Sequence, residues 1–452
     1  MSPVTGGSLQ ERTAAGILIF ILVWFGQVVS LLGSGLTGFA LGVWVYQQTG
    51  SATQLSIILV CTRFPAVILS PIAGVCVDRW DRRLVMLFSD LGAGASILSI
   101  AILMFVGHLA AWHICIAMAI NSACTAFRWP AYSAATTLLV PKKHFGRAGG
   151  LVATAEAIAQ TVSPVLGALL LGLIKIQGIF LIDFATFIFS TLTLLLVRFP
   201  NLLKANKIAS IKTSLIREAS YGWTYISSRP GLLGLLIFFA FTNFFSGFIL
   251  VLTTPLVLSL GSATLLGTVL SVGGIGFLSG SLVMSAWGGP RRRMKGVFGF
   301  QIVRALCFIL AGAAPSGRLI AIAAFSLFFS NPFIDGCSQA IWQSKVPADV
   351  QGRVFAARRM VAFSSIPIAY LCAGPLADYL FEPWLSVGGP LASSIGRLIG
   401  AGPGRGIAFL FVIMGFATLF MVGVAHWYPR LRFLEDEVVD AIPDTTMSGV
   451  LA

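Results

Sequence analysis

The sequence predicts an all-α membrane protein with twelve transmembrane helices arranged as two six-helix halves. Only 10% of the 452 residues are charged, 57% are hydrophobic, and the mean hydropathy is +0.91, whereas a typical soluble domain has about 25% charged residues. The hydrophobic residues gather in runs long enough to span a bilayer, about 20 residues each. Short patterns of the first half also recur in the second. This composition excludes a soluble enzyme, a disordered chain and a nucleic-acid-binding protein.

Twelve apolar runs follow one another along the chain. The first run continues far beyond the apolar region of a signal peptide, so we interpret it as a spanning helix. A long basic stretch after the sixth run predicts four parts: a first half (1–198), a linker (199–230), a second half (231–430) and an acidic tail (431–452). The runs cover residues 15–46, 51–73, 84–107, 110–137, 149–174, 178–198, 231–258, 263–286, 296–314, 318–341, 354–379 and 405–428.

The net charge of +14 is distributed as membrane topology requires. Lysine and arginine cluster in the linker and in the loops after the even-numbered runs, and the opposite loops contain few. The positive-inside rule places both termini, the linker and the tail in the cytoplasm, as in a bacterial inner-membrane protein. The opposite loops contain only Lys175, Arg318, Arg397 and Arg405.

Two pairs of short patterns indicate that the halves arose by duplication. A P-x4-G-R pattern opens the fifth run at Pro141 and the eleventh run at Pro347, a displacement of 206 residues. Asp81-Arg82-Arg83 before the third run corresponds to Arg291-Arg292-Arg293 before the ninth, a displacement of 210 residues. Two six-helix halves related along the membrane normal are a known transporter architecture.

The loop after the second run resembles the G-x-x-x-D-R-x-x-R-R signature of the major facilitator superfamily. The matching residues are Gly74, Asp78, Arg79, Arg82 and Arg83. Patterns at 44–51, 128–132, 339–353 and 434–437 are similar to the subgroup with macrolide-efflux proteins and the enterobactin exporter. The resemblance implies a secondary transporter that exports small amphipathic molecules, with protons as the coupling ion.

The signature loop is the predicted conformational latch between the two states of transport. Gly74 allows close helix approach because it lacks a Cβ atom. Asp78 is expected to cap a helix N-terminus and to pair with an arginine. A static topology anchor made of Arg79, Arg82 and Arg83 is the alternative. The second copy, Trp287-Gly-Gly-Pro290, lacks the acid, so the latch is expected to be asymmetric.

Charges inside apolar runs are costly and indicate function or ion pairing. Arg63 lies near the middle of the second run, where it is expected to bind an anionic substrate group or to pair with a carboxylate. Glu156, deep enough in the fifth run to be shielded from water, is the first candidate for proton coupling, and Asp90 in the third run is the second. Structural pairing is the alternative role of Asp90 and Arg304, and Asp183 is expected to be structural.

Polar faces on the first, fifth and seventh runs are predicted to line the substrate cavity. Their cavity candidates, besides Arg63, are Gln27, Ser30, Ser34, Gln160 and Asn243. Several drug antiporters that resemble this chain carry an acid on the first helix, where Ser34 stands here. Hydrogen bonding between helices is the alternative role of such side chains.

Two proline-containing segments are predicted helix bends at a moving interface. Ser163, Pro164 and Gly167 resemble a degraded form of the G-P-x-x-G-G motif of drug/proton antiporters, and Gly374-Pro375 offers a second bend. Proline removes a backbone hydrogen bond, and small neighbours allow close crossing. A bent helix in a static bundle would give the same pattern.

No nucleotide, cofactor or metal is implied by the sequence. It contains no Walker A pattern and no metal-ligand spacing among seven cysteines and four histidines, and Gly273-Gly274-Ile-Gly276 lies in an apolar run, which indicates close helix packing. The expected partners are a small-molecule substrate, protons and the lipid bilayer, with the chain as a monomer. A facilitator or importer of the same fold is the nearest alternative, and a non-transporting membrane scaffold or sensor is the third.

Overall fold

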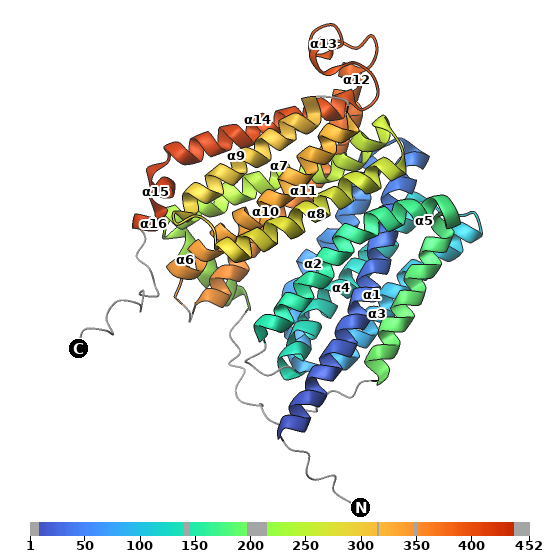
Figure 1. The fold of residues 1–452 in the computed structure, drawn as a ribbon, viewed down its shortest axis with the longest axis vertical. Coiled ribbons are helices and arrows are strands. Elements are labelled where there is room, and N and C mark those ends of the chain that lie inside the picture. The colour runs from blue at the N-terminus through green and yellow to red at the C-terminus, as the bar shows by residue number, and fades with distance from the viewer. Residues whose placement is uncertain (1–8, 140–144, 197–214, 314–315, 348–349, 438–452) are drawn as a thin grey trace, which may run out of the picture. The chain divides into compact units, whose positions relative to one another are not determined.

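The computed structural model describes residues 9–139, 145–196, 215–313, 316–347 and 350–437 (Figure 1). Every regular element within these ranges is helical. The long helices are α1 (Leu9–Thr49), α2 (Ala52–Arg79), α3 (Arg82–Phe105), α4 (Ala111–Leu139), α5 (Phe145–Leu196), α7 (Pro230–Leu260), α8 (Ala263–Trp287), α9 (Arg293–Ala313), α10 (Gly317–Lys345), α11 (Gln351–Leu376) and α14 (Arg405–Trp427). The short elements are α6 (Leu215–Ser227), the π-helical turn η2 (Ala377–Phe381), α12 (Glu382–Leu385), α13 (Gly396–Ile399), α15 (Pro429–Arg432) and α16 (Leu434–Glu437).

The helix lengths agree with the predicted membrane-spanning segments. Ten of the described helices are long and apolar enough to cross a bilayer. Helix α5 holds two of the predicted runs, because Lys175 interrupts it with a left-handed backbone conformation (φ 58°) that side-chain-bearing residues rarely adopt. Counting both parts of α5 and adding the 29-residue α4 gives the twelve expected segments.

The first of two compact units contains residues 1–209 together with 262–271. Within it, α1 packs along α5, and α4 packs against α2 and α3. Its core is apolar, with fully buried side chains such as Leu55, Ile100 and Phe180. We call this part unit 1.

The second compact unit, called unit 2, contains residues 210–261 and 272–452. Helix α9 packs against α10 and α14, and α7 packs against α11. Glycine sets one of its close contacts: a Cβ atom on Gly276 of α8 would lie 2.4 Å from the carbonyl oxygen of Phe325 on α10. The interpretation of Gly273-Gly274-Ile-Gly276 as a helix-packing motif is confirmed.

Helix α6 shows that part of the predicted linker packs into unit 2. Ile226 is fully buried in its core, and a Cβ atom on Gly222 would lie 2.3 Å from the carbonyl oxygen of Arg353 on α11. Tyr221 and Trp223 remain exposed.

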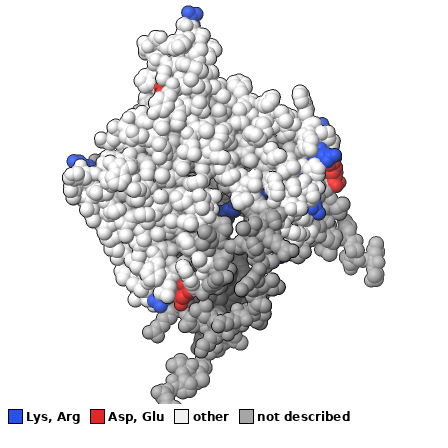
Figure 2. Space-filling view, turned by 180° about the vertical axis from the view of Figure 1, so that it is seen from behind, with Lys and Arg blue, Asp and Glu red and all other residues white. Residues whose placement is uncertain are grey.

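The exposed surface of the described helices suits contact with lipid. Large apolar side chains such as Leu173, Leu282 and Phe420 are more than two-thirds exposed. On the face shown in Figure 2, charged side chains are few and most of the described surface is uncharged. A soluble protein rarely exposes so much contiguous apolar surface, because water disfavours it.

Candidate functional site

The signature loop joins α2 to α3, and a carboxylate caps the start of α3. The Oδ1 atom of Asp81 accepts hydrogen bonds from the backbone N–H groups of Arg83 (2.8 Å) and Leu84 (3.4 Å). A carboxylate in this position satisfies amides that lack a partner within the helix, and it faces the positive end of the helix dipole. The capping role of Asp81 was not predicted from the sequence, although an aspartate directly before an apolar run is a helix-start signal.

Arg83 links the start of α3 to the end of α5 by hydrogen bonds. Its Nε atom donates to the carbonyl oxygen of Leu194 (3.0 Å), and its Nη2 atom donates to that of Leu195 (2.6 Å). The last carbonyl groups of a helix have no partner within it and carry the negative end of the dipole, so they attract a cation. This contact therefore stabilises unit 1 at its signature loop.

The other predicted latch side chains cannot be placed in this way. The surroundings of Gly74 and the side chains of Asp78, Arg79 and Arg82 are outside what the structure describes. The latch role of Asp78 stays a prediction.

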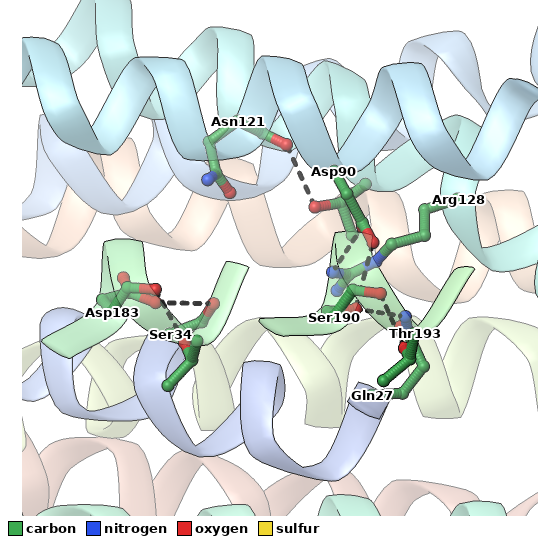
Figure 3. A network of polar contacts seen from close by, with 10 residues as sticks. Gln27, Ser34, Asp90, Asn121, Arg128, Asp183, Ser190 and Thr193 are labelled. Carbon is green, nitrogen blue, oxygen red and sulfur yellow. Dashed lines mark hydrogen bonds and ion pairs between the residues drawn. The ribbon is translucent and has the colours of Figure 1, made fainter. Parts of the chain in front are cut away.

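A buried polar network joins α1, α3, α4 and α5 inside unit 1 (Figure 3). Asp90 on α3 is fully buried, and its Oδ1 atom lies 3.3 Å from Nη1 of Arg128 on α4. Ser190 on α5 donates to Oδ2 of Asp90 (3.1 Å), and Gln27 on α1 donates to the Ser190 hydroxyl (2.9 Å). One carboxylate thus holds polar groups from three other helices, directly or through one hydroxyl.

A second buried carboxylate, Asp183 on α5, lies near this network. The Ser34 hydroxyl on α1 is 3.5 Å from Oδ1 of Asp183, and the Thr186 hydroxyl donates to the Asp183 backbone carbonyl (2.7 Å). Asp183 is fully buried, and among the described residues no cation lies within ion-pair distance of it. The carboxylate beside Ser34 of α1 thus comes from α5.

The predicted polar face of α1 is directed toward α5. Gln27 and Ser30 are buried, Gln27 and Ser34 hydrogen-bond to residues of α5, and Ser163 on α5 donates to the carbonyl oxygen of Leu32 (3.3 Å). These contacts are the helix-to-helix hydrogen bonds of the alternative interpretation. A contact of this face with substrate stays a prediction.

Arg63, Glu156 and Gln160 stand apart from the buried network. All three side chains are exposed on the protein surface. Glu156 lies within a membrane-spanning part of α5, so its exposed side chain does not test the expectation that it is shielded from water. Its role in proton coupling stays a prediction, as does substrate binding by Arg63 and Gln160.

Unit 2 contains its own polar cluster on α7, α9, α10 and α11. Asn243 on α7 donates from Nδ2 to the carbonyl oxygen of Ala362 on α11 (2.9 Å). The Arg304 side chain on α9 is buried, its Nη1 atom is 3.4 Å from the Ser246 hydroxyl, and its Nη2 atom donates to Oδ1 of Asn331 on α10. The structural pairing considered for Arg304 therefore involves neutral oxygen atoms.

The charges of the two clusters are exchanged between the halves. In unit 1 the acid Asp90 is on α3 and Arg128 is on α4, whereas in unit 2 Arg304 is on α9 and Asp335 is on α10. Arg304 and Arg358 both attract the Asp335 carboxylate electrostatically. The duplicated halves thus retain paired polar helices but differ in which helix provides the cation.

The predicted bend segments lie at close helix contacts. A Cβ atom on Gly167 would lie 2.8 Å from Cδ1 of Phe39, so α1 and α5 approach closely beside Pro164. In unit 2, helix α11 ends directly after Gly374-Pro375 and continues as the π-helical turn η2. Proline and π-helical turns are common causes of helix bends.

These features define a class: a polytopic helical membrane protein whose spanning helices carry a buried ion pair and a buried arginine, as transporters do. Comparison with known proteins gives the family. The Major Facilitator Superfamily profile matches residues 23–370, and the chain belongs to this family.

Similar proteins include transporters of known name. Macrolide efflux protein A of Streptococcus pyogenes is 28% identical over 393 residues, which cover 83% of this chain and 93% of that protein. The multidrug efflux pump Tap of Mycolicibacterium fortuitum is 24% identical over 435 residues, 94% of this chain and 98% of that protein. The inward-facing crystal structure of a bacterial homologue of the lysosomal transporter Spinster has a TM-score of 0.69 at 11% identity, with coverage of 92% and 96%. The fold is therefore that of the family.

Proposed function

We propose that this chain is a proton-coupled exporter of small amphipathic molecules, with macrolides as the substrate class. The homology to macrolide and multidrug efflux pumps supports export. In this proposal the chain has two six-helix halves, residues 1–198 and 231–430. Their movement exposes the substrate cavity alternately to the two sides of the bacterial inner membrane. The chain acts as a monomer, with both termini, the linker and the tail in the cytoplasm.

The observation that carries the coupling proposal is the buried Asp90–Arg128 pair. Asp90 accepts hydrogen bonds from Ser190 and Arg128, which belong to α5 and α4. A proton on Asp90 removes the charge that holds the Arg128 guanidinium and changes the bonding of Ser190 and, through it, of Gln27. One proton would thereby alter contacts among four helices, and that is what coupling to a conformational change requires.

Glu156 is the competing proton carrier. A proton on Glu156 breaks no hydrogen bond or ion pair given by the described residues. We therefore place Asp90 before Glu156, in the reverse of the order expected from sequence.

Transport in inverted membrane vesicles tests the proposal. We expect uptake of radiolabelled erythromycin, a macrolide, that rises when a pH gradient is imposed and falls when it is collapsed. Asp90→Asn should abolish gradient-driven accumulation and leave downhill exchange, whereas Asp436→Asn, which changes an exposed acid of the tail, should retain both.

Three outcomes would change the assignment. Accumulation by Asp90→Asn at the wild-type level would contradict the role of Asp90. Loss of accumulation in Glu156→Gln alone would move the role to Glu156. Downhill transport that no pH gradient affects would identify a facilitator.

A further inference from the structure

The start of α9 carries an unfavourable concentration of positive charge. Arg291, Arg292, Arg293 and Lys295 surround the first turn of this helix. A helix N-terminus carries the positive end of the dipole and exposes amide groups with no partner within the helix, so cations there are destabilising. In the first half, the corresponding helix α3 begins with the capping carboxylate of Asp81. The equivalent position in the second half is Arg291, 210 residues later.

A carboxylate from the far end of the chain occupies the missing cap position. The Oε1 atom of Glu435 accepts a hydrogen bond from the N–H of Arg293 (2.9 Å), and its Oε2 atom accepts one from the N–H of Met294 (3.1 Å). Residues 293 and 294 lie 210 positions after Arg83 and Leu84, the two residues whose amides Asp81 caps. The same two amides therefore receive a carboxylate in both halves, from a local aspartate in one and from a distant glutamate in the other.

The segment that carries Glu435 is anchored by two buried leucines that precede it. We call residues 429–437, which form α15 and α16, the tail clamp. Leu431 and Leu434 are 2% and 0% exposed within the core of unit 2. A Cβ atom on Gly231 of α7 would lie 2.4 Å from Cδ1 of Leu434, so the clamp rests directly on that helix.

The tail clamp also reaches α10. The Nζ atom of Lys345, in the last turn of α10, donates to the backbone carbonyl of Glu435 (2.6 Å). The Lys345 carbonyl in turn accepts from the Tyr225 hydroxyl of α6 (3.3 Å). One short segment thus contacts the start of α7, the start of α9 and the end of α10.

We propose that Glu435 is the N-terminal cap of α9 and a positioning residue for transport. It replaces in the second half the carboxylate that Asp81 provides in the first. Through it, the tail clamp joins the adjacent ends of α7, α9 and α10 into one body, so that these ends move together when unit 2 changes state. The second signature loop lacks this acid, and Glu435 supplies a carboxylate from outside that loop.

Amide hydrogen exchange of the purified full-length protein tests the cap without reference to substrate. Losing a capping carboxylate should speed exchange at residues 293–296 by about fivefold to tenfold. We expect this in Glu435→Gln and not in Glu437→Gln, a matched change at an exposed acid two residues later. The double variant Arg291→Asp/Glu435→Gln restores a local cap in the Asp81 position, and its exchange should return to within about twofold of wild type.

Transport per folded molecule tests the positioning role, which rests on the proposed function. With erythromycin in inverted vesicles, we expect Glu435→Gln to lower the maximal rate about fivefold at unchanged KM, and the double variant to recover it. Unchanged exchange in Glu435→Gln, or equal effects in Glu437→Gln, would overturn the cap. Normal turnover per folded molecule alongside faster exchange would overturn the positioning role. If the wild type does not move erythromycin, the proposed substrate class fails and the exchange result still decides the cap.

Discussion

Replacing Asp90 by asparagine removes the negative partner of a guanidinium inside the helix bundle. The Arg128 Nη1 to Asp90 Oδ1 distance is 3.3 Å, and the two side chains are 14% and 0% exposed. Asparagine keeps the shape and one acceptor oxygen, so the Ser190 hydroxyl retains a partner in the same place. The change therefore isolates the charge of Asp90 from its packing.

The burial of the two partners sets the expected magnitude. Removing one partner of a buried ion pair costs about 3–5 kcal/mol, because the other charge is left uncompensated. Asp90→Asn should fall near 3 kcal/mol, the lower end of this roughly 3–5 kcal/mol range, since Arg128 is partly exposed. Arg128→Gln should lie near the upper end, because the carboxylate it leaves is fully buried. The double variant leaves no buried charge and should be the least destabilised of the three.

Unfolding in mixed detergent micelles, followed against the mole fraction of dodecyl sulfate, provides the assay. The single changes should sum to about 8 kcal/mol and the double variant should cost less than about 3 kcal/mol, so we expect the double-mutant cycle to give a coupling free energy of at least about 5 kcal/mol. Additive effects of the two single changes would refute the reasoning, because they would show that the two charges do not interact. The same variants separate structure from transport: a double variant that regains stability without gradient-driven accumulation supports proton coupling, and one that regains both indicates a structural pair.

Further predictions concern packing, capping and topology. Gly312→Ala should destabilise the protein by about 1–3 kcal/mol, because a Cβ atom there would lie 2.2 Å from the carbonyl oxygen of Ala408. Gly299 lies on the same helix, and a Cβ atom there meets nothing within 4 Å. Gly299→Ala should therefore be neutral or stabilising in the same detergent assay. Arg83→Ala should lower the thermal unfolding temperature by freeing two carbonyl groups at the end of α5, and an equal temperature in Arg83→Lys would show that charge alone suffices. A cysteine at exposed Ser386 should react with an impermeant maleimide from outside intact cells and one at exposed Lys295 should not, so the reverse pattern would invert the topology.

Local patterns in the sequence were enough to predict the class of fold. The lengths of the apolar runs are local properties of the chain, and a bilayer of fixed thickness converts them directly into spanning helices. The repeated Asp81 and Arg291 regions marked the duplication, and the signature loop indicated the family. The break in α5 near Lys175 and the end of α11 after Gly374-Pro375 both agree with local residue patterns.

The contacts between polar groups of different helices could not be predicted and became visible in the folded protein. Asp90 pairs with Arg128, which lies 38 residues later in the chain. Glu435 caps amide groups of α9 that lie more than 140 residues earlier. Such pairings depend on how each helix is rotated about its axis and packed on its neighbours, and the spacing of residues within one helix does not specify this. For the same reason Glu156 could be placed at membrane depth from sequence, while its exposed side chain could not be foreseen. The burial of Asp183 was likewise a result of packing, because α1 covers it with the face that carries Ser34.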